Sequence, residues 1–119
     1  MTHPTNRLND DVHQRVRLGI LAILDGAARA DFKYLRETLG VTDGNLGRHI
    51  QVLEEAGFVT VEKVFENRRP RTWTKITRAG RAAFHAEVAA LRELVASAEQ
   101  HAPGMQAAGP GELAGGAAS

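Results

Sequence analysis

The sequence predicts a mainly α-helical domain with one small β-hairpin, an α+β fold class whose last element is a long helix. Apolar residues recur with helical spacing over residues 8–24, 32–39 and 42–56. Alternation typical of two short strands follows over residues 58–65 and 72–76. A further apolar stripe, long enough for about twenty residues of helix, then begins after Thr77.

Composition limits the class of protein. A chain of 119 residues suits one domain, which we place at residues 8–100 between a flexible stretch (1–7) and a tail (101–119). The chain has no cysteine, which excludes disulfides and thiolate metal sites. No apolar run approaches the roughly 20 residues needed to span a bilayer. We therefore expect a soluble, cytoplasmic protein with no membrane partner.

The first helix is predicted from about Leu8 to Leu24. Val12, Val16 and Ile20 fall on one face, and Asp25-Gly26 is a suitable stop. Residues 1–7 are polar and contain Pro4, so they are expected to fray.

Two short helices follow, joined by a tight turn. Asp31 is a good N-cap for a helix over 32–39, and Gly40 breaks that helix. Thr42 can cap the next one, which Gly57 ends as a left-handed residue. Two short helices joined by about three residues, with a glycine in the turn, are typical of a helix-turn-helix.

The second of these helices has an unusually small polar face. Its outward positions are Asp43, Gly44, Asn45, Arg48 and Gln51. Short side chains there would let the helix backbone approach a partner surface closely.

A polar turn over residues 66–71 connects the two predicted strands. Pro70 cannot continue a central strand, so we place it in the turn. The cations around this hairpin are concentrated: seven lie between Lys63 and Arg81 against one anion, Glu66, for a local charge of +6. Such asymmetry favours a phosphate-binding surface over an ordinary solvated face.

The long final helix is predicted from about Arg78 to Ala98. Its stripe extends beyond the core that it has to cover, which favours a homodimer. The candidate dimerisation residues are Val12, Val16, Ile20, Phe84, Val88, Leu91, Leu94 and Val95. Residues 101–119 are rich in Gly, Ala and Pro and nearly uncharged, so we expect a disordered tail.

Several segments together resemble a known family. They are Leu39 to Ile50, Leu53-Glu-Glu-Ala-Gly-Phe-Val, Arg68-Arg-Pro-Arg-Thr and Ile76-Thr-Arg-Ala-Gly. With the order of elements, they resemble bacterial winged helix-turn-helix regulators on the MarR-like side of that superfamily, in the small single-domain "winged helix DNA-binding domain" group. The resemblance covers roughly residues 13–95.

The resemblance implies sequence-specific binding of double-stranded DNA and regulation of transcription by a homodimer, with repression as the default. It implies a recognition helix (42–56) in the major groove and an arginine-rich wing (66–71) at the minor groove or phosphates. The expected DNA-contacting residues are Thr42, Asp43, Gly44, Asn45, Gly47, Arg48, His49, Gln51, Lys63, Arg68, Arg69, Arg71, Thr72 and Lys75.

The sequence offers less support for other classes of function. A winged helix that binds proteins instead of DNA is the alternative, although it should carry apolar or acidic residues at the wing. The five histidines show no ligand spacing, so we expect no metal and no cofactor, with a metal site built between two copies of the chain as the alternative. The sequence shows no pairing of a nucleophile with a base, so we do not expect an enzyme. A small-molecule effector, of unknown identity, fits the resemblance, but no polar group stands out on the buried faces of the first or last helix.

Overall fold

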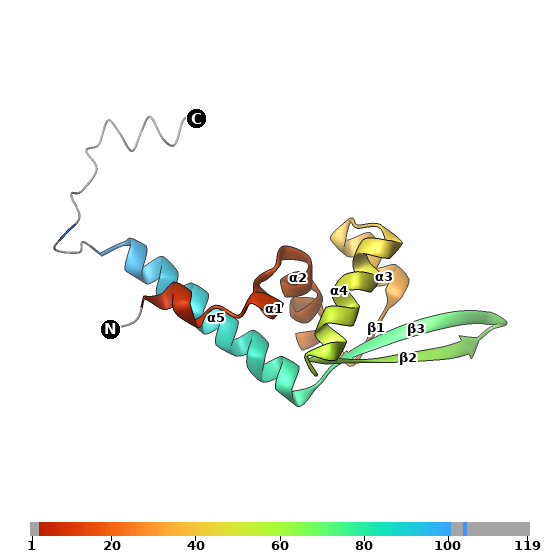
Figure 1. Ribbon diagram of the computed structural model, residues 1–119. Coiled ribbons are helices and arrows are strands. Elements are labelled where there is room, and N and C mark those ends of the chain that lie inside the picture. The colour runs from red at the N-terminus through yellow and green to blue at the C-terminus, as the bar shows by residue number, and fades with distance from the viewer. Residues whose placement is uncertain (1–2, 101–103, 105–119) are drawn as a thin grey trace.

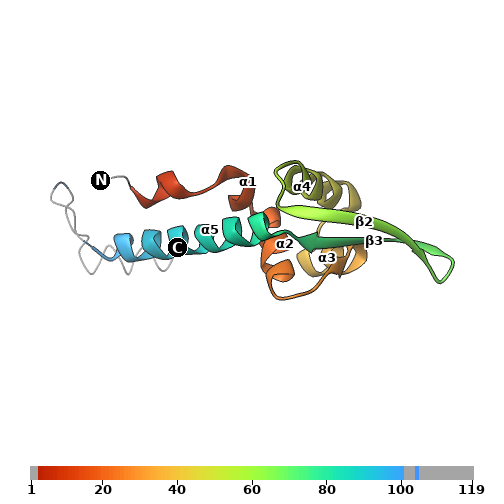
Figure 2. The same cartoon turned by 90° about the horizontal axis from the view of Figure 1, so that it is seen from below.

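The fold is a small helical body from which a β-hairpin and a long helix project in opposite directions (Figures 1 and 2). In this computed structural model, residues 3–100 and residue 104 are described. The predicted tail over 101–119 lies outside the described residues except for Gly104. The elements in chain order are a turn of 3-10 helix (Pro4–Arg7), α1 (Asp10–His13), α2 (Arg15–Asp25), β1 (Ala30–Asp31), α3 (Phe32–Leu39), α4 (Asp43–Glu55), β2 (Val59–Glu66), β3 (Arg69–Ile76) and α5 (Arg78–Ala98).

The predicted fold class is confirmed, and most helix ends lie where the local signals placed them. The side chains of Asp31, Thr42 and Thr77 accept hydrogen bonds from the first turns of α3, α4 and α5. Gly57 follows α4 with a φ of +81°, as expected of a left-handed residue after a helix.

The N-terminal part differs from the prediction. The single helix expected over 8–24 is broken at Gln14, whose backbone is extended. The side chain of Gln14 accepts hydrogen bonds from the amides of Val16 and Arg17, so Gln14 is the N-cap of a separate helix, α2. Pro4–Arg7, expected to fray, form a turn that lies along α5, where Arg7 forms an ion pair with Glu93.

The sheet is antiparallel with strand order β1-β3-β2. The predicted turn over 66–71 is wrong, because only Asn67 and Arg68 lie outside the strands and both have positive φ. Pro70 is a strand residue opposite Phe65. It is tolerated because β1 reaches only Trp73 and Thr74, so β3 has an open edge at Pro70.

The core lies between α2, α4 and the inner end of the sheet. Ile20, Leu21 and Leu24 of α2 pack with Leu46 and Leu53 of α4. Val12 and Val16, together with Ile20, are also buried within this single chain. These three residues were expected at a dimer surface, but they are covered here by the chain's own core and offer no side chain to a partner.

The start of α5 is held against the end of α4. A Cβ on Gly80 would lie 2.0 Å from the carbonyl oxygen of Phe58, so only glycine fits there. Thr77 donates its hydroxyl to the carbonyl of Gly57 and its amide to that of Phe58. These contacts fix the direction in which α5 leaves the body. Among the described residues, no helix is long and apolar enough to cross a membrane.

Candidate nucleic-acid interface

The polar face of α4 is open, as predicted. Thr42, Asp43, Gly44, Arg48 and Gln51 are exposed, while Asn45 and Gly47 are partly covered. A Cβ built on Gly44 or Gly47 would meet nothing within 4 Å. No internal contact therefore requires glycine at these two positions, although each weakens the helix by about 1 kcal/mol relative to alanine.

Two polar side chains of α4 already have partners. Arg36 of α3 donates to the carboxylate of Asp43 at 2.7 Å. Gln51 donates to Glu55 one turn later at 3.2 Å. The charge of Asp43 is thereby balanced within the protein, which reduces its repulsion of a polyanion at this helix N-terminus.

His49 is buried, unlike the other α4 residues predicted to contact DNA. Its exposed fraction is 7 %, and Arg17 of α2 lies 3.0 Å from its Nδ1. A guanidinium has no acceptor, so Nδ1 must accept and the ring is neutral with its proton on Nε2. Burial lowers the pKa of His49, and the charges of Arg17, Arg48 and Arg15 lower it further. His49 thus supports α4 from inside.

Arg17 connects α4 to the N-terminal part of the chain. Its guanidinium donates to the carbonyls of Asp11 and Asp10 as well as contacting His49. Neither Arg17 nor Arg36 was singled out from the sequence, because both are ordinary helix-surface positions whose partners lie on other elements.

The wing, β2 and β3 with their two-residue turn, carries the expected cations. Arg68 lies in the turn and Arg69 begins β3, and both are exposed. Lys63 and Thr72 face each other across the strands and line a groove with Gly47 and Gln51 of α4. Lys75 is exposed on β3. The structure therefore brings α4 and the wing to adjoining surfaces.

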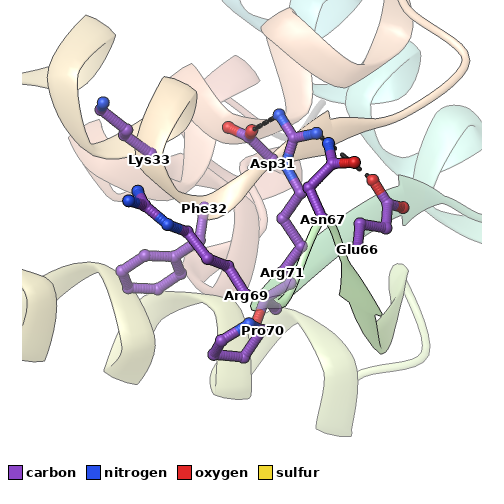
Figure 3. Close-up of a pocket in the computed structure, with 9 residues that line it drawn as sticks. Asp31, Phe32, Lys33, Glu66, Asn67, Arg69, Pro70 and Arg71 are labelled. Atoms are coloured by element: carbon purple, nitrogen blue, oxygen red, sulfur yellow. Dashed lines mark hydrogen bonds and ion pairs between the residues drawn. The ribbon is translucent and has the colours of Figure 1, made fainter.

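Arg71 has a different environment from the other wing arginines. It donates to Asp31 at 2.8 Å and to Glu66 at 3.3 Å, and Figure 3 shows it reaching from β3 to Asp31. The amide of Tyr34 and the guanidinium of Arg71 lower the pKa of Asp31. Trp73 donates to Glu66, and its ring lies beneath Arg29 and near Arg71. Arg71, which lies opposite Val64 in the half of the wing nearer the turn, therefore ties that half to Asp31, the N-cap of α3.

Most of the cations between residues 63 and 81 form no ion pair with the other described residues. Of the seven cations between Lys63 and Arg81, only Arg71 and Arg81 form ion pairs with other described residues. The remaining five, Lys63, Arg68, Arg69, Lys75 and Arg78, are all exposed. Glu66 is the one anion between residues 63 and 81. Its presence is the one sequence signal that a nearby arginine, Arg71, has a partner within the protein.

A buried acid was missed by the sequence reasoning. Glu87 of α5 is 1 % exposed and accepts from the amide of Asn9 and from His13, each at 2.8 Å. The expectation that no polar group lies on the buried face of the last helix is therefore wrong. In residues 3–100 and at Gly104, no cluster of three or more acidic or histidine side chains could hold a metal ion.

Comparisons with known proteins agree with this geometry. The model of the family described as "Winged helix DNA-binding domain" matches residues 16–95. An uncharacterized protein of Methanocaldococcus jannaschii is 49% identical over 69 residues, which span 58% of this chain and 75% of that protein. The resemblance drawn from the sequence is confirmed.

Solved structures share the fold. A transcriptional regulator homologue from Pyrococcus horikoshii OT3 superposes with a TM-score of 0.70 at 33% identity, covering 76% of this chain and 89% of its own. The Mycobacterium tuberculosis transcriptional regulator MOSR, solved in complex with DNA, has a TM-score of 0.62 at 21% identity, covering 84% and 71%. The second likeness concerns the fold alone.

Proposed function

Because this chain belongs to the winged helix DNA-binding domain family, we propose that it regulates transcription by binding double-stranded DNA sequence-specifically as a homodimer. The regulation that we propose is repression, in which the bound dimer blocks access to a promoter. Both the P. horikoshii structure and MOSR are described as transcriptional regulators or their homologues, and MOSR was solved with DNA.

One observation carries the proposal: the exposed, unneutralised cations of the wing adjoin the open polar face of α4. A surface of this kind suits a polyanion, since each cation can replace a condensed counterion at a phosphate. A protein-binding winged helix should instead show apolar or acidic residues along both elements. The long exposed arginines and the absence of bulk at Gly44 and Gly47 favour DNA.

We assign base reading to α4. The N-terminal half of a recognition helix enters the major groove, where Asn45 can pair with an adenine edge and Arg48 with a guanine edge. Gln51 is the third side chain that is long enough to reach a base. Thr42 and the two glycines then allow the backbone to approach the phosphates closely.

Arg68 and Arg69 are assigned to the minor groove or its phosphates. Lys63, Thr72 and Lys75 contact the flanking backbone. For His49 and Arg71, which the chain's own residues hold, we propose supporting roles in place of direct contacts: His49 positions α4, and Arg71 fixes the angle of the wing.

The homodimer is proposed on the projecting part of α5. Val95 is 61 % exposed, and Leu91 and Leu94 are only partly covered by the single chain. Val88 and Phe84 continue this stripe toward the body, where Phe84 packs on the core. Pairing two such helices would bury the stripe, and a two-fold DNA site would require the two copies of α4 to lie about 34 Å apart, one turn of DNA.

Selection of binding sites from random duplexes by the purified full chain tests the function. We expect enrichment of a two-fold symmetric site with half-sites about ten base pairs apart. Enrichment must fall with Arg48→Ala but stay unchanged with Arg92→Ala, a matched removal of an exposed cation from α5. Failure to enrich any sequence, together with capture of a protein partner that Arg48→Ala leaves unchanged, would favour the protein-binding alternative.

Sedimentation of the wild type and Val95→Asp tests the dimer separately. Val95 is exposed, so its replacement should leave the protomer folded while a charge disrupts the paired helices. A wild-type monomer at concentrations that saturate DNA would contradict the dimer.

A further inference from the structure

The wing carries an exposed aromatic side chain that the assigned DNA contacts do not use. Phe65 is 73 % exposed, the most exposed of the large hydrophobic residues in the described part of the chain. It lies one residue before the end of β2 and directly opposite Pro70 of β3. The two residues form a small apolar pair next to the turn.

This pair lies on the face of the hairpin that turns toward α4. Alternate residues share a face of a strand, so Phe65 is on the same side of β2 as Lys63, Val61 and Val59. Val59 packs in the core, and Lys63 lines the groove shared with Gly47 and Gln51 of α4. Phe65 continues this face one step toward the tip. It therefore adjoins the surface that α4 presents.

The surroundings of the pair are cationic. Arg68 lies in the turn beside the pair, and Lys63 is two residues before Phe65 on the same face, whereas Arg69 lies opposite Glu66 on the other face. The nearby anion, Glu66, points to the other face, where it accepts hydrogen bonds from Trp73 and Arg71. Phe65 and Pro70 can pack against apolar walls of a partner, and the neighbouring cations can bind anionic groups at the edges of the same surface.

The minor groove of DNA is such a surface, because its walls are deoxyribose rings and its rims are phosphates. We propose that Phe65, with Pro70 behind it, is an apolar wedge that packs against the sugar walls of the minor groove while Arg68 and Arg69 hold its rims. This inference rests on the proposed DNA binding and adds a contact that reads groove shape. A narrow, A·T-rich groove brings the two walls close to the ring and is the preferred site.

Salt dependence separates this apolar contact from an ionic one. We compare the full-length wild type, Phe65→Ala, Phe65→Leu and Arg69→Ala by fluorescence anisotropy on the selected duplex. A matched duplex has G·C pairs where the wing binds. Phe65→Ala should lower affinity about 10-fold on the A·T-rich duplex, less on the G·C-rich one, with the slope of log affinity against log salt unchanged. Phe65→Leu should restore part of the loss, and Arg69→Ala should reduce the slope.

The outcomes separate the two claims. Equal affinity of the wild type and Phe65→Ala overturns the wedge alone, whereas a wild type that binds no duplex overturns the proposed function and the wedge with it. A Phe65→Ala variant that keeps its DNA affinity but loses self-association in sedimentation assigns the residue to contact between copies and also overturns the wedge. Because Phe65 is exposed, the unfolding midpoint should match the wild type in each case.

Discussion

The helix α4 and the wing, the two elements that we propose to bind DNA, have two different kinds of surface. α4 is a rigid helix, packed on the core through Leu46, Ile50 and Leu53, with few side chains long enough to reach a base. The wing projects from the body (Figure 2). Arg68 and Arg69, at its end, are exposed. The difference suggests a division of labour in which the wing supplies most of the affinity and α4 supplies most of the discrimination between sequences.

Each surface is anchored by one charged residue that the protein itself neutralises. Arg36 holds Asp43 at the start of α4, and Asp31 holds Arg71 in the half of the wing nearer the turn. Both pairs join an element that we propose to contact DNA to α3 or its N-cap. The body therefore fixes the relative placement of the two surfaces before any DNA is bound.

Removing the wing cations should have the largest effect. Arg68→Ala with Arg69→Ala should lower affinity about 100-fold on every duplex, because two charge-assisted contacts are lost from each wing. The salt slope should shrink as well, by about one for each phosphate contact removed. Anisotropy at several salt concentrations measures both, with Arg92→Ala as control. An unchanged slope would show that these arginines do not contact phosphate.

Arg48→Ala should act on sequence discrimination. We expect a loss of about 10-fold on the selected duplex and little change on an unrelated one, since the lost bond is to a base edge. Competition between the two duplexes measures the ratio. Equal losses on both would assign Arg48 to phosphate and weaken the division of labour.

The glycines of α4 should separate stability from binding. Replacing both Gly44 and Gly47 by alanine should raise the free energy of unfolding by about 1 kcal/mol each, since both positions are open and helical. The added methyl groups should weaken binding severalfold by holding the backbone away from DNA. Urea unfolding and anisotropy measure the two effects. A stabilised variant with unaltered affinity would show that the glycines are only tolerated.

The pH dependence of the free energy of unfolding should report the burial of His49 in α4. We expect this effect to be the smallest of the four. Burial and neighbouring arginines lower the pKa of His49, so the unfolded chain binds a proton that the folded chain resists. The free energy of unfolding should therefore fall as pH drops below about 6.5, the usual pKa of histidine. Urea unfolding between pH 7.5 and 5.5 should give a smaller decrease for His49→Gln. Identical decreases would mean that His49 titrates normally.

Local signals were sufficient for the order of elements and most of their ends. Thr42, Gly57 and Thr77 act within one or two turns of their own position, so the sequence around them determines the cap. The break at Gln14 was missed because an apolar stripe continues through it, and glutamine is not among the preferred caps. The tighter turn was missed because an arginine occupies a left-handed position that usually takes glycine.

The site was predictable in outline only. The exposed residues of α4 and the arginines of the turn follow from helical period and local charge. Which charges are free does not, because Arg71 finds Asp31 forty residues away along the chain and His49 finds Arg17 thirty-two residues away. Glu87, which no sequence signal marked as buried, likewise accepts a hydrogen bond from the amide of Asn9, the N-cap of α1. Such pairings depend on how the helices pack.

The most direct test of the account is the salt dependence of wild-type binding to the selected duplex and to a scrambled one. If each dimer neutralises six to eight phosphates, log affinity should fall with log salt at a slope of about −5 to −7 on the selected duplex. The preference for that duplex should persist across the range, because base contacts release no counterions. Salt-independent binding, or equal affinity for both duplexes, would contradict a sequence-specific regulator whose wing supplies the affinity.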